Sequence, residues 1–265
     1  MRNTFLALPG PPVPEAILFA TDSRISYSGG DTRDAGPKLF PLTSNSGVVY
    51  AGWVESGVKC IRSLQNHFHG RTIESPLEDM RQAELIVRNE HLSLLKERNI
   101  EGARLKLLIG IYDTQQNAAK LFRLVDDSTP PFKAEEIEGL HGIGRPQTVD
   151  VFKHEFEKFF DSQLGGPGGG VSDNPMQWLN FITIALMRVI ETEVDRGVGG
   201  LVQTAIVGRN GFSWGGHGVI RPDDSEIATQ RMDSRWRQIN EKGHLIQETD
   251  ISLDPATCIL SKISD

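Results

Sequence analysis

An acid and a base flank one polar loop near the start of the chain, and their spacing allows them to form an ion pair. Asp22 follows the apolar run of residues 16–20, and Lys38 opens the next apolar run, sixteen positions later. A loop of that length can return and bring the carboxylate beside the ammonium. Each charge would then keep the other ionised in a partly buried setting. By itself, the pattern also fits a solvated turn.

The residues around this pair resemble those of the proteasome β-subunit family, which belongs to the N-terminal nucleophile (Ntn) hydrolases. The resemblance rests on Asp22-Ser23-Arg24 at the end of a strand, on Lys38, and on Ala51-Gly52, where an apolar strand leads into a helix. It implies an α+β fold, a four-layer αββα sandwich of the Ntn-hydrolase/proteasome type, within a domain of residues 1–220. Residues 221–265 lie outside it, and we expect them to form a C-terminal extension packed on the same domain.

The resemblance also implies a nucleophile and its base. An N-terminal threonine in such hydrolases supplies a hydroxyl nucleophile, and its own free α-amine takes the hydroxyl proton. Thr4 is the only threonine before the second expected strand. Lys38 matches the lysine that would lower the pKa of this amine by like-charge repulsion, and Asp22 matches the acid that would hold the lysine in place.

Four further site residues come from the same resemblance. Arg24 matches the arginine of the strand-end motif, and Asp195 matches the acid of the family's Asp-x-x-Ser-Gly-Gly segment. The backbone N–H of Gly52 or of Trp53 is the candidate donor to an oxyanion, because preorganised amide donors stabilise the negative charge of a tetrahedral intermediate.

The chain departs from the family pattern at the residues nearest the nucleophile. Met1-Arg2-Asn3 precedes Thr4, so Thr4 would gain a free amine only if the Asn3–Thr4 bond were cleaved, for instance by self-processing. Ile143 and Val198 are apolar where the family has hydroxyl side chains, and their loss removes solvation that a buried charge needs. These departures favour a site that is divergent or silent.

Three functions therefore stay open. The first is a threonine-type peptidase or amidase that cleaves amide bonds of a peptide or amide substrate once Thr4 is exposed. The second is a catalytically silent structural or assembly subunit, and the resemblance implies a ring-type homo-oligomer in either case. The third is a binding protein that reuses the fold, since fold does not fix function. The intact Asp22, Arg24 and Lys38 place the hydrolase slightly ahead.

Composition excludes several other classes of protein. The 265 residues carry a net charge of −7 with a pI near 5.6, which argues against a nucleic-acid partner. No apolar run approaches the roughly 18 residues that a membrane span needs, so we expect a soluble, cytoplasmic protein. Cys60 and Cys258 lie far apart in no ligand-spaced motif, and His67 and His69 have no third ligand nearby in sequence. We expect no metal and no cofactor.

Apolar periodicity and turn residues locate the elements that must position the site. Four helices are predicted at 54–68, 76–98, 147–161 and 175–195. Strands are predicted at 4–8, 16–20, 38–42, 47–53, 105–112, 119–125, 132–137 and 201–207. We expect residues 211–214 and Val219 to pair with the last of these. Beyond them we expect a helix at 233–241 and an edge strand at 245–253. The first two strands should form a hairpin that brings Thr4 near Asp22.

Overall fold

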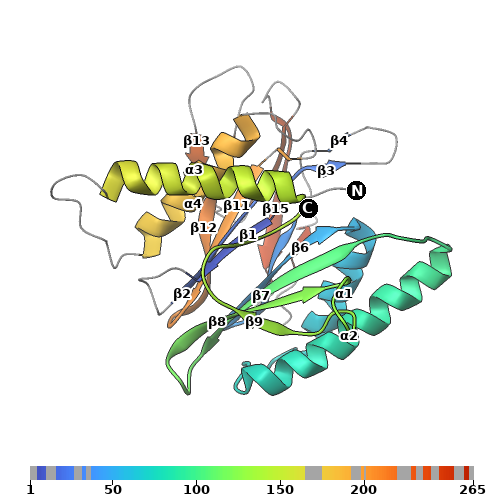
Figure 1. The fold of residues 1–265 in the computed structure, drawn as a ribbon. Helices are drawn as coiled ribbons and strands as arrows, with labels where there is room; N and C mark the ends of the chain where they lie inside the picture. Colours follow the sequence, from blue (N-terminus) through green and yellow to red (C-terminus); the bar gives the residue numbers. More distant parts are fainter. Residues whose placement is uncertain are drawn as a thin grey trace.

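The computed structural model describes the backbone of residues 5–9, 16–26, 32–33, 37–164, 175–191, 198–199, 201–219, 228–230, 235–239, 245–253 and 260–262. Side chains are described for residues 16–24, 37–158, 175, 178–190, 198–199 and 202–214. Within these parts the fold is mixed α/β, with four helices and two larger antiparallel sheets (Figure 1). The predicted mixture of helices and antiparallel strands is confirmed.

The first sheet has six strands, and Asp22 directly follows the end of one of them. Its spatial order is β10 (His141–Ile143), β1 (Phe5–Pro9), β2 (Ala16–Thr21), β11 (Leu201–Gly208), β12 (Gly211–Val219) and β13 (Ala228–Gln230). The predicted hairpin of β1 and β2 is confirmed, with Phe5 opposite Thr21. Strand β13 comes from the C-terminal extension and pairs with β12, so part of that extension completes this sheet.

The second sheet has five strands and begins directly after Lys38. Its order is β5 (Leu39–Thr43), β6 (Ser46–Gly52), β7 (Leu105–Asp113), β8 (Ala118–Val125) and β9 (Glu135–Ile137). The expected strand at 132–137 is shorter than predicted, because Phe132 has a φ of 60°. That left-handed conformation is incompatible with a strand, so pairing starts only at Glu135.

The four helices are α1 (Val54–His67), α2 (Pro76–Arg98), α3 (Pro146–Leu164) and α4 (Pro175–Glu191). Their predicted ranges are confirmed to within a few residues, except that the expected end of α4 near Asp195 lies outside the described residues. Helix α2 starts with proline in its first turn and two acids, and it ends at Asn99 in the left-handed conformation. Both are ordinary helix boundary signals.

The C-terminal extension contains a third sheet, of three strands, in the order β14 (Arg235–Ile239), β15 (Leu245–Leu253) and β16 (Leu260–Lys262). The predicted helix at 233–241 is therefore wrong, and β15 lies between two strands rather than at an edge. The segment lacks a helical apolar repeat, and pairing with β15 supplies partners for its backbone groups instead. A short pair, β3 (Ile25–Ser26) with β4 (Thr32–Arg33), lies in the loop after Asp22.

Each large sheet has one face against helices and the other against the opposite sheet. One apolar cluster joins β5–β8 to α1 and α2, and a second joins β2 and β11 to α3 and α4. A third lies between the sheets, where Phe19 of β2 approaches Gly47 of β6 and Gly110 of β7. A Cβ atom on Gly110 would lie 2.7 Å from the Phe19 ring. The sheets therefore approach closely where glycine leaves room for an aromatic ring.

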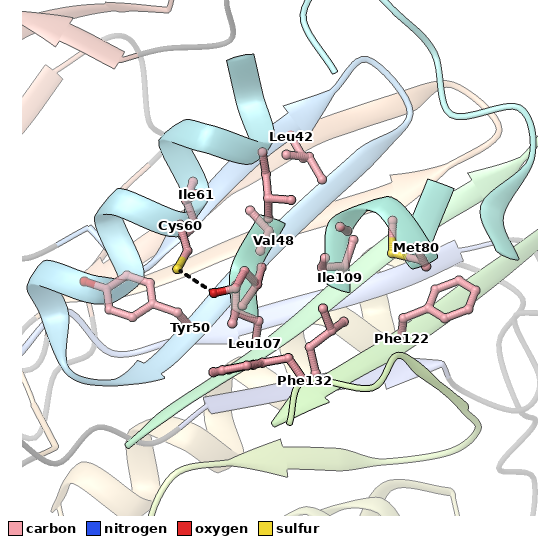
Figure 2. Packing of buried hydrophobic residues seen from close by; sticks show 14 of the residues in the cluster. Leu42, Val48, Tyr50, Cys60, Ile61, Met80, Leu107, Ile109, Phe122 and Phe132 are labelled. Carbon is pink, nitrogen blue, oxygen red and sulfur yellow. Dashed lines mark hydrogen bonds between the residues drawn. The ribbon is translucent and has the colours of Figure 1, made fainter. Parts of the chain in front are cut away.

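Cys60 and Tyr50 lie in the apolar cluster under α1 and α2 (Figure 2). The Cys60 thiol donates to the carbonyl of Val87 at 3.7 Å, and burial raises its pKa to about 12. A thiol that stays protonated is a poor nucleophile, so Cys60 serves as a packed core residue rather than a reactive one. The Tyr50 ring lies against Gly57 of α1, where a Cβ atom would be 2.3 Å from it.

His91 is a buried hydrogen-bonding residue that joins α2 to α1. Its Nδ1 lies 2.8 Å from the hydroxyl of Ser56, and its ring meets those of Trp53 and Phe132 edge-on. Burial lowers the pKa of His91, outweighing the nearby charge of Asp126 and a hydrogen bond with the backbone of Ala103. The folded protein therefore favours the neutral imidazole.

Replacing Gly110 with alanine should destabilise the protein by about 1–3 kcal/mol, because the added methyl overpacks the space between the sheets. Urea unfolding measures the change. Gln116→Ala in the exposed β7–β8 turn is the control and should be within about 0.5 kcal/mol of the parent. Trimming the facing ring with Phe19→Leu should make the effect of Gly110→Ala smaller. Equal effects in both backgrounds would contradict this packing.

His91 should make the protein less stable as the pH falls below about 6.5, its reference pKa. The folded pKa is lowered, so in this range the unfolded chain binds the proton more readily than the folded one. Urea unfolding between pH 5 and 8 should show a shallower pH dependence in His91→Gln than in the parent. Gln116→Ala, which changes an exposed residue without an ionisable group, is the control and should keep the parent's pH profile. If the free energy of unfolding depended on pH identically in all three proteins, protonation of His91 would not be a cause of that dependence.

Candidate functional site

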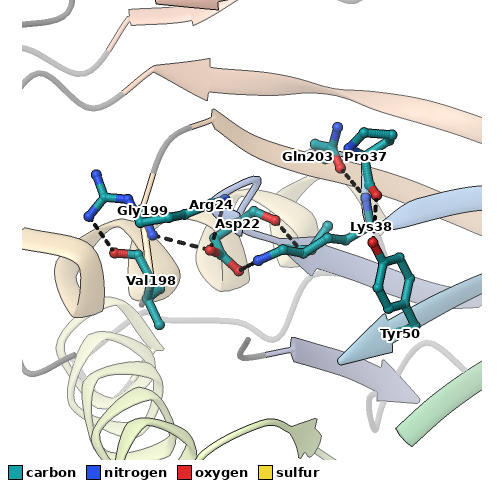
Figure 3. Close-up of polar contacts among 9 residues, drawn as sticks. Asp22, Arg24, Pro37, Lys38, Tyr50, Val198, Gly199 and Gln203 are labelled. Atoms are coloured by element: carbon teal, nitrogen blue, oxygen red, sulfur yellow. Dashed lines mark hydrogen bonds and ion pairs between the residues drawn. The ribbon is translucent and has the colours of Figure 1, made fainter. Parts of the chain in front are cut away.

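The predicted ion pair is present and fully buried (Figure 3). Asp22 follows the last residue of β2, and Lys38 precedes the first residue of β5. The Lys38 ammonium donates to Oδ1 of Asp22 at 2.8 Å, and neither side chain is exposed to solvent. Because β2 and β5 belong to different sheets, this ion pair ties the two sheets together at one end.

The second carboxylate oxygen of Asp22 organises the backbone around it. Oδ2 accepts the N–H of Arg24 at 3.2 Å and the N–H of Gly199 at 3.1 Å. The carbonyl of Gly199 in turn accepts the N–H groups of Ser23 and Arg24, at 3.2 and 3.0 Å. The Arg24 guanidinium donates to the carbonyl of Val198 at 3.3 Å. Residues 198–199 are thereby held against the end of β2.

Glycine at position 199 leaves room for the Arg24 side chain. A Cβ atom there would lie 2.4 Å from the guanidinium carbon of Arg24. A side chain at this position would therefore displace the guanidinium from its place beside Val198.

Two residues that the sequence reasoning missed fix the backbone on either side of Lys38. The side-chain oxygen of Gln203 accepts the N–H of Lys38 at 3.2 Å, and the Lys38 carbonyl accepts the N–H of Tyr50 at 3.3 Å. The Tyr50 hydroxyl donates to the carbonyl of Pro37, also at 3.3 Å. Gln203 interrupts the apolar run of β11, and a polar residue in such a run is the signal that could have identified it.

Burial dominates the titration of this cluster. It raises the pKa of Asp22 above its ordinary value, whereas the Lys38 ammonium, followed by the hydrogen bonds from Lys38, Gly199 and Arg24, lowers it. Burial and the charge of Asp22 together raise the pKa of Tyr50, so its phenol stays protonated and can donate to Pro37. The negative charge of the Asp22 carboxylate thus depends on Lys38 and on the backbone N–H groups of Arg24 and Gly199.

The two candidate oxyanion donors lie at the end of β6, the strand next to β5. Gly52 has a φ of 113°, and a Cβ atom there would lie 2.0 Å from the carbonyl oxygen of Arg104. The N–H of Trp53 donates to that same carbonyl at 2.8 Å. It would have to leave Arg104 before it could bind an oxyanion, which counts against Trp53 as the donor.

Thr4 and Asp195 lie outside the described residues. Phe5, the residue after Thr4 in sequence, pairs with Thr21 on one side and with Ile143 on the other. Ile143 and Val198, the two apolar departures from the family pattern, are both buried. Val198 contacts Arg24, so both departures lie next to the strand ends that carry the site.

The described residues hold no group of three or more histidine, cysteine or acidic side chains arranged to bind a metal ion. None of the helices in the described part is long and apolar enough to cross a bilayer. What the cluster offers chemically is a fixed ammonium paired with an acid, and backbone N–H groups hold the second oxygen of that acid. Comparison of the sequence with models of known protein families finds no match, and neither does comparison with curated proteins.

Replacing Lys38 with methionine should destabilise the protein by about 3–5 kcal/mol, because it leaves the Asp22 carboxylate buried without its counter-charge. In the double variant Asp22→Asn/Lys38→Met no charge is buried, and the amide oxygen can still accept backbone N–H groups. The double variant should therefore be more stable than Lys38→Met alone, as measured by urea unfolding.

The matched control is Lys59→Met, which breaks the partly exposed ion pair with Glu90. Surface pairs contribute little, so its cost should stay below about 1 kcal/mol. A double variant that is less stable than Lys38→Met would show that Asp22 and Lys38 are not energetically coupled. A Lys59→Met variant as unstable as Lys38→Met would show that burial does not increase the cost of breaking the pair.

Proposed function

We propose that this protein is an Ntn-type amide hydrolase of the proteasome-like kind, folded as a four-layer αββα sandwich, that uses Thr4 as its nucleophile after removal of residues 1–3. The observation that carries the proposal is the fully buried Asp22–Lys38 pair at the end of the β1–β2 hairpin. An acid and a lysine of this kind are the supporting groups that such chemistry requires. The helix, sheet, sheet, helix packing supports the same assignment.

The proposed reaction begins with proton transfer from the Thr4 hydroxyl to the free α-amine of the same residue. An α-amine has a reference pKa of about 8, close to working pH. The Lys38 ammonium lowers that pKa further by like-charge repulsion, and Asp22 holds the ammonium in position. The hydroxyl oxygen then attacks the substrate carbonyl, forming a tetrahedral intermediate.

The intermediate places negative charge on the former carbonyl oxygen, for which the Gly52 N–H is the proposed donor. The protonated α-amine gives its proton to the leaving amine, the C–N bond breaks, and an ester to Thr4 remains. Water activated by the same amine hydrolyses the ester and restores the hydroxyl. The substrate class is a peptide or another amide, and Arg24 and Asp195 complete the proposed site by organising its backbone and supporting the nucleophile.

A silent structural subunit is the second candidate, and one observation favours it. Ile143 and Val198 are buried beside the same strand ends and offer no hydroxyl to a charged amine. In this case the Asp22–Lys38 pair serves only to join the two sheets. Because the resemblance to the proteasome family implies a ring-type assembly, such a subunit would form part of a homo-oligomeric ring.

Intact-mass spectrometry with N-terminal sequencing of the purified full chain separates the two candidates. A hydrolase should yield a chain that begins at Thr4, and Thr4→Ala should block that processing if it is autocatalytic. A chain that retains Met1-Arg2-Asn3 under all conditions excludes Thr4 as an N-terminal nucleophile, and the structural role then follows.

Lys38→Met should lower the rate of amide hydrolysis by about 100-fold or more, because the α-amine loses the charge that tunes its pKa. A β-lactone probe, which acylates nucleophilic hydroxyl groups, should add its mass to Thr4 in the parent and not in Thr4→Ala. Near-ultraviolet circular dichroism must first show that Lys38→Met is folded. A folded variant that is acylated at the parent's rate would remove Lys38 from the mechanism.

A further inference from the structure

Gln203 is a buried polar residue among apolar neighbours on one face of β11. Alternate residues of a strand share a face, so Gln203 lies on the same face as Ala205 and Val207, which belong to the apolar cluster between the sheets. It is 2% exposed. A buried amide is costly unless its polar atoms form hydrogen bonds, and Oε1 of Gln203 accepts the N–H of Lys38 at 3.2 Å. The side chain therefore reaches from the first sheet to the segment that begins the second.

The five-stranded sheet departs from a regular ladder at Lys38. Leu39 is opposite Val49. A regular antiparallel register would next set Lys38 opposite Tyr50, and the two residues would exchange two backbone hydrogen bonds. Tyr50 does donate to the Lys38 carbonyl at 3.3 Å, but Lys38 gives its own N–H to Gln203 (Figure 3). Gln203 thus takes the place of a strand partner, and β5 begins one residue later, at Leu39.

These two backbone contacts of Lys38 lead to different sheets. Tyr50 belongs to β6, the neighbour of β5, so its bond fixes Lys38 only relative to its own sheet. Gln203 belongs to β11, which pairs with β2 in the first sheet. Asp22 directly follows β2, and the other neighbour of β2 is β1, the strand that begins with Phe5. Gln203 therefore fixes the backbone of Lys38 relative to the sheet that carries Asp22 and Phe5.

The ion pair by itself does not determine where the Lys38 ammonium lies. Lysine carries its charge on a flexible four-carbon stem, and Asp22 holds only the tip of that stem, at 2.8 Å. A main chain free to shift would let the ammonium approach the carboxylate from several directions. With the main chain also held, by Gln203, both ends of the lysine are fixed relative to the first sheet.

We propose that Gln203 is a positioning residue for amide hydrolysis: by holding the N–H of Lys38, it sets the distance between the Lys38 ammonium and the α-amine of Thr4. The inference rests on the proposed function, in which Thr4 directly precedes Phe5 of β1. This distance decides how strongly the ammonium lowers the pKa of the amine, because the interaction between two charges weakens as they separate.

A neutral substitution of Gln203 can change this distance without changing the charges of the site. Figure 3 shows the charged or titratable side chains next to Lys38: Asp22 and Arg24 follow β2, and Tyr50 comes from β6. Gln203→Met removes the acceptor and alters none of these groups. A changed pH dependence in this variant would therefore arise from the position of Lys38.

Hydrogen exchange of the Lys38 amide tests the contact itself, whether or not the protein is a hydrolase. In the full chain with isotope-labelled lysine, Gln203→Met should make this N–H exchange about 10-fold faster or more, because the hydrogen bond that protects it is lost. Gln203→Glu keeps an acceptor oxygen in the same place and should restore most of the protection. An unchanged exchange rate in Gln203→Met would overturn the proposal.

The pH dependence of Thr4 acylation by the β-lactone probe tests the role in the reaction. In the matured chain, Gln203→Met should react about 10-fold more slowly than the parent near pH 7, because an amine less influenced by Lys38 holds its proton more strongly. The deficit should shrink as the pH rises and both amines lose their protons. A purely structural defect would lower the rate by the same factor at every pH. Gln203→Asn, which draws the acceptor back, is a second variant and should change the profile in the same direction.

Gln65→Met is the matched control. Gln65 is also a buried glutamine, 4% exposed, and its Nε2 donates to the backbone of β5 at Pro41, at 2.8 Å, but from α1 in the outer helix layer. Its substitution also removes a buried hydrogen bond to β5, yet it should leave the exchange of Lys38 and the pH profile of acylation at the parent's values. Circular dichroism and urea unfolding check that every variant keeps the parent's fold.

The outcomes distinguish this inference from the proposed function. If the parent is not acylated at Thr4, the proposed function fails, and the role of Gln203 in the reaction fails with it. If the parent is acylated and Gln203→Met keeps the parent's pH profile, Gln203 is not a positioning residue, although the proposed function stands. The same conclusion follows if Gln65→Met changes the profile as much as Gln203→Met does.

Discussion

The buried ion pair between Asp22 and Lys38 is the interaction on which the arrangement of the molecule at this end depends. It joins the end of β2 to the start of β5, and therefore one sheet to the other. Two charges removed from water are costly unless other groups compensate them. Here the compensation comes from the backbone of Arg24 and Gly199 on the acid side, and residues 198–199 could not adopt another path without leaving Oδ2 of Asp22 underbonded.

The same buried ion pair would serve a catalytic site or a purely structural contact between the two sheets. A lysine used to tune an amine must be held still, and the groups that hold it are the same ones that a purely structural pair would need. What separates the two roles is the neighbourhood of β1. Ile143 lies beside Phe5 and brings a buried branched side chain to the place where a reacting amine would need solvation. The described geometry is therefore well suited to fixing a charge and less well suited to solvating a second one.

Much of this arrangement could be predicted from local sequence. Apolar periodicity and a Ser-Pro start located α2 to the residue, and the apolar runs around 16–20 and 105–112 gave the central strands nearly complete. The pairing of Asp22 with Lys38 followed from spacing and resemblance. Gln203 and Tyr50 could not be identified in this way, because their partners are backbone groups of Pro37 and Lys38 that only tertiary structure brings near. The segment at 235–239 was misjudged because a short strand depends on its neighbour rather than on its own periodicity.

Tyr50 has a consequence that reaches beyond its own hydrogen bond. Its ring lies against Gly57 in α1, and its hydroxyl reaches the carbonyl of the residue before Lys38. Three contacts and one peptide bond thus connect α1 to Asp22: Gly57 contacts the Tyr50 ring, Tyr50 donates to Pro37, Pro37 is bonded to Lys38, and Lys38 donates to Asp22. Because closely packed interiors leave little room for adjustment, a substitution that displaced the Tyr50 ring would disturb the backbone at Pro37, next to Lys38. The position of the Lys38 charge therefore depends on helix α1 as well as on the strands.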